Sequence, residues 1–382
     1  MLEAGAVITL EAGSYRLHAP LAGSAYGIVW CADRLPAGPR VALKLINRQQ
    51  MERAEPGQRA RWIASANKEI VFLRSLAPWD ARHLVRLLDC GVHQGLPVMA
   101  LELLDGDLGR HVARERGFKR AIGFAQALDW LAQLNQALAK VHQYGWRYLD
   151  LKPSNVLLDA RGGSVKLADF GTSRLLTDCS AHSYAGTASW QAPEQFFPAA
   201  GNTYLTNARS DYFALGALFY FLVTGGLPLR FCRDCGQARR DHQEAGAAML
   251  RERHSGAIPP TLADDEAALF LQRIAGRSEA ASAQDATWCA TGAAMTTATA
   301  MATTTPTPTS DGATMTDGAG APALALTLLR SLLSVDPGAR PPHALAISRT
   351  IAAIRQRAHA ANADNATDAA NTAGTALRRS CA

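Results

Sequence analysis

The feature that most constrains the fold of this chain is a change in its hydrophobic period after Gly106. Before that point, residues 13–46 and 84–104 carry short apolar runs separated by glycine and proline, a pattern that predicts strands. Between these two stretches, residues 60–76 repeat apolar side chains at steps of three and four, which predicts an amphipathic helix. The first third of the chain is therefore expected to be a sheet with one helix.

Beyond Gly106 the helical period dominates. One apolar stripe runs from Phe124 to Val141, and Gly145 follows it as a stop signal. A small strand-rich part followed by a larger helical part predicts an α+β protein of two lobes with a cleft between them.

Length and composition exclude several classes of protein. The chain has 382 residues, 48% of them hydrophobic, which is enough for a large buried core. Its 39 Lys and Arg residues exceed its 33 Asp and Glu residues by six, without a dense basic run, so no nucleic acid partner is expected. The most apolar stretch, Tyr212 to Val223, is shorter than the roughly 20 residues that cross a bilayer. It is expected to be a buried helix, and no membrane span is predicted.

The cysteine content and the N-terminal residues bear on the compartment. Seven cysteines are scattered over a long chain, which does not suit a small disulfide scaffold. Residues 1–10 lack the basic flank of a signal peptide. A cytoplasmic location is therefore predicted, whereas the oligomeric state has no signal in the sequence.

Cys232 and Cys235 have the two-residue spacing of a zinc knuckle. A structural zinc site needs four ligands, and His242, His254 and Cys289 are the only candidates nearby. The favoured interpretation is two free thiols on a surface loop, with a zinc site as the alternative.

Two segments are expected to be disordered. Residues 277–322 are rich in Ala, Thr, Gly and Ser and have few large apolar side chains, which predicts a disordered insertion. The Ala- and Asn-rich residues 356–382 predict a disordered tail.

The run Asp150-Leu151-Lys152-Pro153-Ser154-Asn155 carries groups that phosphoryl transfer requires. Asp150 could orient an acceptor hydroxyl and take its proton, Lys152 could neutralise the moving phosphoryl group, and Asn155 could hold Mg²⁺. The alternative is a polar turn around Pro153. Downstream, Asp169-Phe170-Gly171 follows an apolar run, and a carboxylate at a strand end suits a metal ligand.

Lys44 and Glu69 are less specific signals. Lys44 ends the strand-like run Val41-Ala42-Leu43-Lys44, where its ammonium group could reach the phosphates of ATP. Glu69 lies on the predicted helix and could hold Lys44 in place. Each, taken alone, is more typical of a solvated surface residue.

These motifs, in this order, resemble those of the eukaryotic-type protein kinase family. Four further matches extend the resemblance: Ala192-Pro193-Glu194, Ser210-Asp211, Asp336-Pro337 and Arg340. The resemblance implies a two-lobed protein kinase fold over residues 13–355, with an N-terminal lobe at about 13–104 and a C-terminal lobe at about 105–355. It also implies ATP and Mg²⁺, a protein substrate, and an ion pair between Arg340 and Glu194.

The resemblance also implies a nucleotide site. Leu101 to Leu104 would be the hinge that binds adenine, with Leu101 as gatekeeper. The implied nucleotide-contacting residues are Leu21, Gly27, Val29, Ala42, Lys44, Glu102, Leu104, Asp107 and Leu157. The metal ligands would be Asn155 and Asp169, and the catalytic groups Asp150, Lys152, Lys44 and Glu69. For the apolar members of this set, plain core packing is the alternative.

Two positions depart from the family pattern. Ala22 and Ser24 stand in the phosphate loop where the family has glycine, which predicts weaker ATP binding. Leu149 replaces the arginine that pairs with a phosphorylated activation loop, here residues 172–190. We therefore expect activity that does not require phosphorylation of the six activation-loop hydroxyls, Thr172, Ser173, Thr177, Ser180, Ser183 and Tyr184.

The predicted function is ATP-dependent phosphorylation of serine or threonine, since Lys152 and Thr187 match the members of the family with that specificity. Two alternatives stay open. One is a pseudokinase that acts as an ATP-binding or scaffold module, which Leu149 and the altered phosphate loop favour. The other is a small-molecule kinase of similar fold, against which Thr187 and Glu194 argue.

Overall fold

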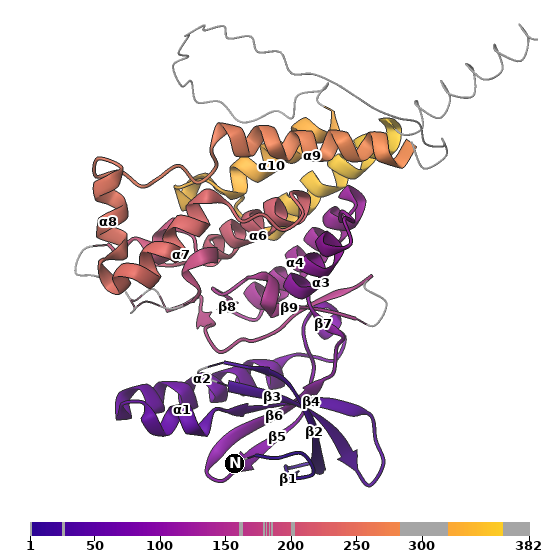
Figure 1. Ribbon diagram of the computed structural model, residues 1–382, viewed down its shortest axis with the longest axis vertical. Coiled ribbons are helices and arrows are strands. Elements are labelled where there is room, and N and C mark those ends of the chain that lie inside the picture. Colours follow the sequence, from indigo (N-terminus) through magenta and orange to yellow (C-terminus); the bar gives the residue numbers. More distant parts are fainter. Residues whose placement is uncertain are drawn as a thin grey trace, which may run out of the picture.

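A computed structural model describes residues 2–24, 27–159, 163–178, 180, 182, 184, 186–199, 203–282 and 320–361. In it a twisted sheet with two helices forms one lobe, and a bundle of helices forms the other (Figure 1). The α+β, two-lobed architecture predicted from the change in hydrophobic period is confirmed.

The N-terminal lobe is built on a six-stranded antiparallel sheet in the order β1-β2-β3-β4-β6-β5. Its strands are β1 (Val7–Thr9), β2 (Ser14–Gly23), β3 (Gly27–Leu35), β4 (Arg40–Ile46), β5 (Leu87–His93) and β6 (Leu96–Glu102). Gln94 and Gly95 make the turn between β5 and β6 with positive φ angles of 49° and 79°. The sequence analysis missed β1, whose three residues are too few for a periodic signal.

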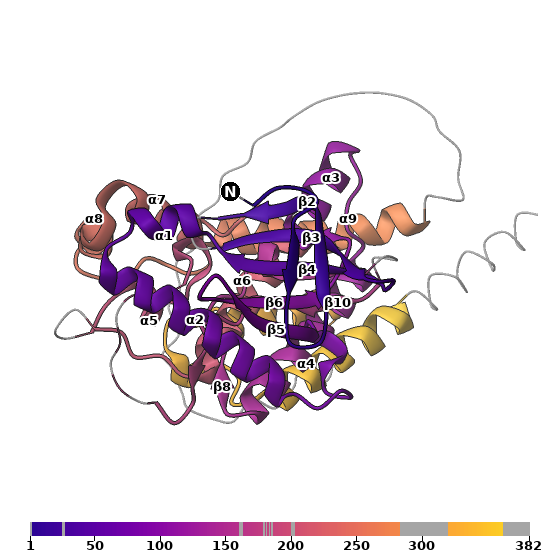
Figure 2. The ribbon, with the colours of Figure 1, turned by 90° about the horizontal axis from the view of Figure 1, so that it is seen from below.

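Two helices accompany this sheet, α1 (Arg48–Arg53) and α2 (Pro56–Ser75), seen beside it on the left in Figure 2. The helix predicted at residues 60–76 is α2, and Pro56 at its first turn explains its earlier start. Glu69, Phe72 and Leu73 are its buried residues. A polar residue among them shows that α2 does more than cover the core.

The C-terminal lobe is mainly helical. Its helices are α3 (Leu108–Gly117), α4 (Phe124–Gln143), α5 (Pro193–Phe196), α6 (Ala208–Val223), α7 (Arg230–His242), α8 (Gly246–Arg253), α9 (Asp264–Ser282), α10 (Ala321–Leu332) and a last helix at residues 344–361. Short strands line its side toward the sheet: β7 (Gly106–Asp107), β8 (Trp146–Arg147), β9 (Val156–Leu158), β10 (Val165–Leu167) and β11 (Arg174–Leu175).

The apolar segment Tyr212 to Val223 is the buried helix that its composition predicts. It forms most of α6, which is buried on nearly every side. Gly216 is required there, because a β-carbon would lie 2.8 Å from the Leu332 side chain of α10. Among the described residues, no helix is long and apolar enough to span a membrane.

The boundaries of the predicted disordered segments need correction. Helix α9 continues to Ser282, and α10 begins at Ala321, so both ends of the predicted insertion 277–322 are helical. The last helix likewise runs to residue 361, past the predicted tail boundary at 356. Alanine-rich sequence favours helix, and buried Ile351 and Ile354 anchor this one. Residues 283–319 and 362–382 lie outside the described part of the chain.

The prediction of a surface loop at Cys232 and Cys235 is wrong. Both cysteines lie in α7 with buried side chains, because Phe231, Cys232, Cys235 and Ala238 form its inward face. Burial raises the pKa of both thiols well above the ordinary value. No cluster of metal-binding side chains occurs among the described residues, which do not include Cys289.

Candidate active site

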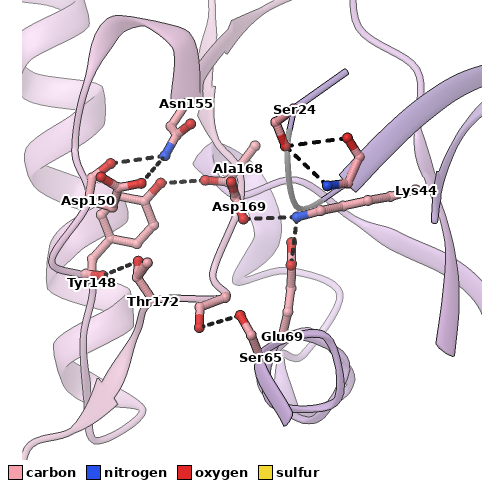
Figure 3. A network of polar contacts seen from close by, with 12 residues as sticks. Ser24, Lys44, Ser65, Glu69, Tyr148, Asp150, Asn155, Ala168, Asp169 and Thr172 are labelled. Atoms are coloured by element: carbon pink, nitrogen blue, oxygen red, sulfur yellow. Dashed lines mark hydrogen bonds and ion pairs between the residues drawn. The ribbon is translucent and has the colours of Figure 1, made fainter. Parts of the chain in front are cut away.

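Lys44 is held between two carboxylates that come from different lobes (Figure 3). Its Nζ lies 2.7 Å from Glu69 Oε2 on α2 and 2.8 Å from Asp169 Oδ1 after β10. The strand period explains this orientation: Leu43 and Leu45 point into the buried core, so Lys44 points to the opposite side of the sheet. The structure thus brings together three of the residues singled out in the sequence.

Electrostatics fixes the ionisation of this group. Burial alone would lower the pKa of Lys44, but the charges of Asp169 and Glu69 outweigh it and hold that pKa above the usual value. The charge of Lys44 is the main cause that holds the pKa of Asp169 below its usual value. Lys44 is therefore a cation and Asp169 an anion at neutral pH.

Helix α2 is locked to the Asp169-Phe170-Gly171 turn by close backbone packing. Ser65 Oγ donates to the Gly171 carbonyl oxygen at 2.8 Å. A β-carbon at Gly171 would lie only 2.5 Å from Ser65 Oγ, so any larger residue would disturb this contact. Asp169 itself has a φ of 61°, which for a non-glycine residue indicates local backbone strain.

Asp150 is the second centre of the site. It is 7% exposed, and its carboxylate accepts from Lys152 Nζ at 2.7 Å, Thr187 Oγ1 at 2.8 Å and Asn155 Nδ2 at 3.1 Å. Lys152 also donates to Thr187 at 2.8 Å. Burial raises the pKa of Asp150, an effect that Lys152 opposes. A buried carboxylate with a raised pKa and fixed orientation suits a general base.

The loop that carries Asp150 is anchored from below by Asp211 of α6. Its carboxylate accepts from Tyr148 N at 2.8 Å, from Leu149 N at 2.6 Å, and lies 2.8 Å from His142 Nε2. Leu149 has a φ of 69°, so the anchoring hydrogen bonds hold a strained backbone. In the sequence Asp211 stands out only as a match to the family pattern, because no local signal indicates this anchoring role.

Phe170 connects the two centres through apolar contacts. Its ring lies 4.5 Å from the ring of Phe72 on α2 and 5.3 Å from that of Tyr148, measured between centroids. The Tyr148 hydroxyl donates to the carbonyl oxygen of Ala168, as Figure 3 shows. The position of α2 is therefore coupled mechanically to the loop of Asp150.

Asn155 and Asp169 offer oxygen atoms suited to a hard cation. Asn155 uses its amide nitrogen to bond Asp150, which leaves its carbonyl oxygen for a ligand. The Asp169 side chain is 49% exposed, and only Oδ1 contacts Lys44. Because Mg²⁺ prefers carboxylate and amide oxygens, this donor set fits the metal.

The expected nucleotide-lining residues lie on facing elements. Val29 pairs with Lys44 between β3 and β4, and Leu157 pairs with Asp107 between β9 and β7. Val29, Ala42, Leu104 and Leu157 are all half-buried, so each keeps apolar surface uncovered. Uncovered apolar surface suits contact with a flat ring, though the same burial would also suit core packing.

Two of the expected nucleotide contacts are already engaged by protein groups. The Glu102 carboxylate lies 2.6 Å from Lys166 Nζ and 3.3 Å from Arg86 Nε. The Asp107 carboxylate caps α3 by accepting from Arg110 N at 2.9 Å, and it pairs with the Arg110 side chain at 3.2 Å. No local pattern in the sequence signals these partners, because they depend on the tertiary fold or on the capping geometry of α3.

The phosphate loop is closed on itself. Gly27 N donates to Ser24 Oγ at 3.0 Å, and Ser24 N donates to the Gly27 carbonyl oxygen at 2.8 Å. An open hollow of about 760 Å³ lies beside the loop, lined by Pro20, Leu21, Ala22, Gly23, Ser24, Ile28, Asn47, Gln50 and Arg110. Leu21 is the only expected nucleotide contact in that lining, so the hollow is not the whole predicted nucleotide site.

The predicted ion pair between Glu194 and Arg340 is confirmed. Arg340 Nη1 and Nη2 lie 2.7 and 2.8 Å from the two carboxylate oxygens, a bidentate arrangement. This pair fixes α5, which follows the activation loop, to the C-terminal part of the domain.

Comparisons with known proteins agree with this geometry. Residues 22–349 match the family described as the protein kinase domain. The serine/threonine-protein kinase PkaA of Streptomyces coelicolor is 32% identical over 231 residues, which cover 56% of this chain and 39% of the relative. Serine/threonine-protein kinase pkn2 of Myxococcus xanthus is 29% identical over 224 residues, 56% of this chain and 25% of the relative. CBL-interacting protein kinase 30 of rice is 28% identical over 221 residues, 56% of this chain and 43% of the relative. The chain thus spans less than half the length of each of these three.

Proposed function

The chain belongs to the eukaryotic-type serine/threonine protein kinase family, and from that premise we propose that it transfers the terminal phosphoryl group of ATP to serine or threonine hydroxyls of proteins. The observation that carries this proposal is the buried Asp150 carboxylate, which Lys152, Thr187 and Asn155 hold in one orientation. A fixed, buried carboxylate with a raised pKa is typical of a general base.

Each group has a part in the transfer. Asp150 orients the acceptor hydroxyl and takes its proton as the oxygen–phosphorus bond forms. The bond from the terminal phosphorus to the bridging oxygen breaks, and ADP leaves with the electron pair. Lys44, held by Glu69 and Asp169, positions the phosphates, and Lys152 neutralises charge on the phosphoryl group.

Asn155 and Asp169 would hold Mg²⁺, which when bound neutralises phosphate charge. Their free oxygen atoms support this assignment. Specificity for serine or threonine is supported by the Lys152–Thr187 hydrogen bond beside Asp150, because it fixes two polar groups where the acceptor must lie. A cytoplasmic location stays a prediction.

A pseudokinase is the second candidate, and the closed phosphate loop favours it, since Ser24 occupies the Gly27 N–H. Against it, Lys44, Asp150, Asn155 and Asp169 are all present with partners at hydrogen-bond distance. A small-molecule kinase is less well supported, because α5 and the Glu194–Arg340 pair form part of the platform that binds proteins in this family.

The test is transfer of radiolabelled phosphate from ATP with Mg²⁺ to the chain itself and to a generic protein substrate. Three proteins are compared: the native chain, Asp150→Ala, and the control Asp33→Ala, which removes an exposed carboxylate paired with Arg40. We expect transfer by the native chain and the control and none by Asp150→Ala, with label on serine or threonine. Absence of transfer from the native chain while ATP still binds would favour the pseudokinase.

A further inference from the structure

Asp178, in the activation loop, lies among basic side chains from three elements. Arg174 of β11 forms an ion pair with its Oδ2 atom. Arg147 of β8 donates through Nη2 to the Asp178 carbonyl oxygen at 2.8 Å and through Nη1 to the Leu175 carbonyl oxygen at 3.0 Å. Lys68 of α2 is half-buried and within electrostatic reach of both Arg174 and Asp178. One carboxylate thus offsets part of the charge of three cations.

The Asp178 carboxylate is fixed as well as charged. Its Oδ1 atom accepts from the Ser180 hydroxyl and from Ser180 N, the latter at 3.2 Å. The Ser180 hydroxyl is the main cause that holds the pKa of Asp178 below its usual value. The group is therefore an oriented anion at neutral pH, since hydrogen bonds to a carboxylate favour its charged form.

Arg147, which binds the main chain of the activation loop, is itself part of the buried core. It is 1% exposed, although arginine is almost never buried unless it is paired. It stands three residues before Asp150, and β8 pairs with β11 at Arg147 and Arg174. By contrast Leu149, where the family pattern has the arginine that binds a phosphorylated loop, is apolar and buried. Arg147, two residues earlier, contacts the activation loop instead, through the main-chain carbonyl oxygens of Leu175 and Asp178.

Most hydroxyls of the described activation loop are not placed to receive a phosphate. Ser173 is fully buried. The Thr172 hydroxyl donates to the Tyr148 carbonyl oxygen at 3.4 Å, and Tyr184 donates to Gln191 Oε1 at 2.6 Å. Ser180 is bound to Asp178. Thr177 is exposed and is the natural control position.

We propose that Asp178 is a built-in anion that, through its ion pair with Arg174, holds the activation loop against β8 and so orders the active site without phosphorylation. Its effect on catalysis rests on the proposed function. Asp178 is a positioning residue: its partner Arg174 pairs with Arg147 of β8, three residues before Asp150, and the activation loop carries Thr187, which bonds Asp150.

The first experiment compares kcat and the KM for ATP of the native chain with those of Asp178→Asn, which keeps the shape and removes the charge. We expect kcat to fall about tenfold, in the range of measured couplings between contacting residues, with the KM for ATP changed less than about twofold. Asp178→Glu should recover part of kcat, and Thr177→Ala should match the native chain. Asp178→Asn with native kcat would overturn the proposal.

Hydrogen exchange of residues 174–178 provides a readout that needs no catalysis. Faster exchange in Asp178→Asn than in Thr177→Ala would support the proposal, and equal exchange would overturn it. If the native chain transfers no phosphate, the proposed function fails while exchange still decides the role of Asp178. If Asp178→Asn does not fold, Arg174→Met tests the same ion pair from β11: faster exchange at 174–178 supports the proposal, and native exchange overturns it.

Discussion

Among single residues, Ser24 is the one most at odds with nucleotide binding. Its hydroxyl accepts the Gly27 N–H, and Asn47 Nδ2 donates to its carbonyl oxygen at 3.0 Å, so the loop is held from both sides. Backbone N–H groups in such loops donate hydrogen bonds to phosphate oxygens. Binding of ATP to the Gly27 N–H would require its hydrogen bond to the Ser24 hydroxyl to break, which costs free energy. A glycine at position 24 has no hydroxyl, so this cost would be absent.

We therefore predict that Ser24→Gly lowers the KM for ATP by about two- to tenfold, the net value of one hydrogen bond of about 0.5–1.5 kcal/mol. Ser24→Ala removes the hydroxyl without adding backbone freedom and should give part of the gain. Initial rates at varied ATP concentration measure both. A higher KM in both variants would mean that the hydroxyl contacts the nucleotide instead.

The raised pKa of Asp150 predicts that kcat depends on pH. Its pKa is raised by burial, and a general base must be ionised to accept a proton, so kcat should fall as pH decreases through that raised value. The loss should begin at a higher pH than an ordinary aspartate, with its pKa of about 3.9, would give. In Asp150→Asn the remaining rate should be lower by a factor of about 10² to 10⁴ and should lack this acid limb. An unchanged acid limb in that variant would assign the titration to another group.

At the scale of elements, the decisive contact joins α2 to the turn after β10. Ser65 and Glu69 are four residues apart and so share one face of α2. Ser65 binds the Gly171 carbonyl oxygen, and Glu69 binds Lys44. A shift of α2 would break both contacts together, because the helix moves as a rigid body.

Gly171→Ala tests this coupling. Its β-carbon would lie 2.5 Å from Ser65 Oγ, so either the Ser65 hydroxyl turns away and loses its bond to Gly171, or α2 shifts and the Lys44–Glu69 contact lengthens. We expect kcat/KM to fall at least about tenfold with the fold retained, since a displacement of about 1 Å can cost a hundredfold. Gly57→Ala is the control, because Gly57 also lies in α2 but has no atom within 4 Å of its β-carbon position. Adding Ser65→Ala should restore part of the loss, whereas full activity of Gly171→Ala alone would refute the coupling.

The order of elements could be predicted because it depends on local periodicity. The apolar stripe from Phe124 to Val141 and the stop at Gly145 predict α4 directly, and Gly145 has the positive φ of 82° that a helix end favours. The partners of Glu102 could not be predicted, because Lys166 reaches it from β10, 64 residues away, and Arg86 from the residue just before β5. The surface-loop prediction for Cys232 and Cys235 was wrong because a spacing of three positions suits both a zinc knuckle and the buried face of a helix.

In the whole molecule, the long-range ion pairs differ greatly in burial. Arg340 and Glu194 are separated by 146 residues, yet the Arg340 side chain is fully buried and also donates to the carbonyl oxygens of Ser334 and Arg209. Arg355 and Asp129 join the last helix to α4, with side chains 39% and 53% exposed. Removing one partner of a buried pair leaves the other charge without compensation, whereas exposed charges are solvated by water.

Arg340→Met should therefore lower the free energy of unfolding by about 3–5 kcal/mol, because Glu194 would keep a charge in a mostly buried position. Arg355→Met, the matched control, should change it by less than about 1 kcal/mol. Denaturant titrations of the native chain and both variants measure these differences. Combining Arg340→Met with Glu194→Gln removes both charges and should recover part of the loss. Equal effects of the two single variants would mean that burial does not set the value of these pairs, and the activation loop would then need another anchor to the C-terminal lobe.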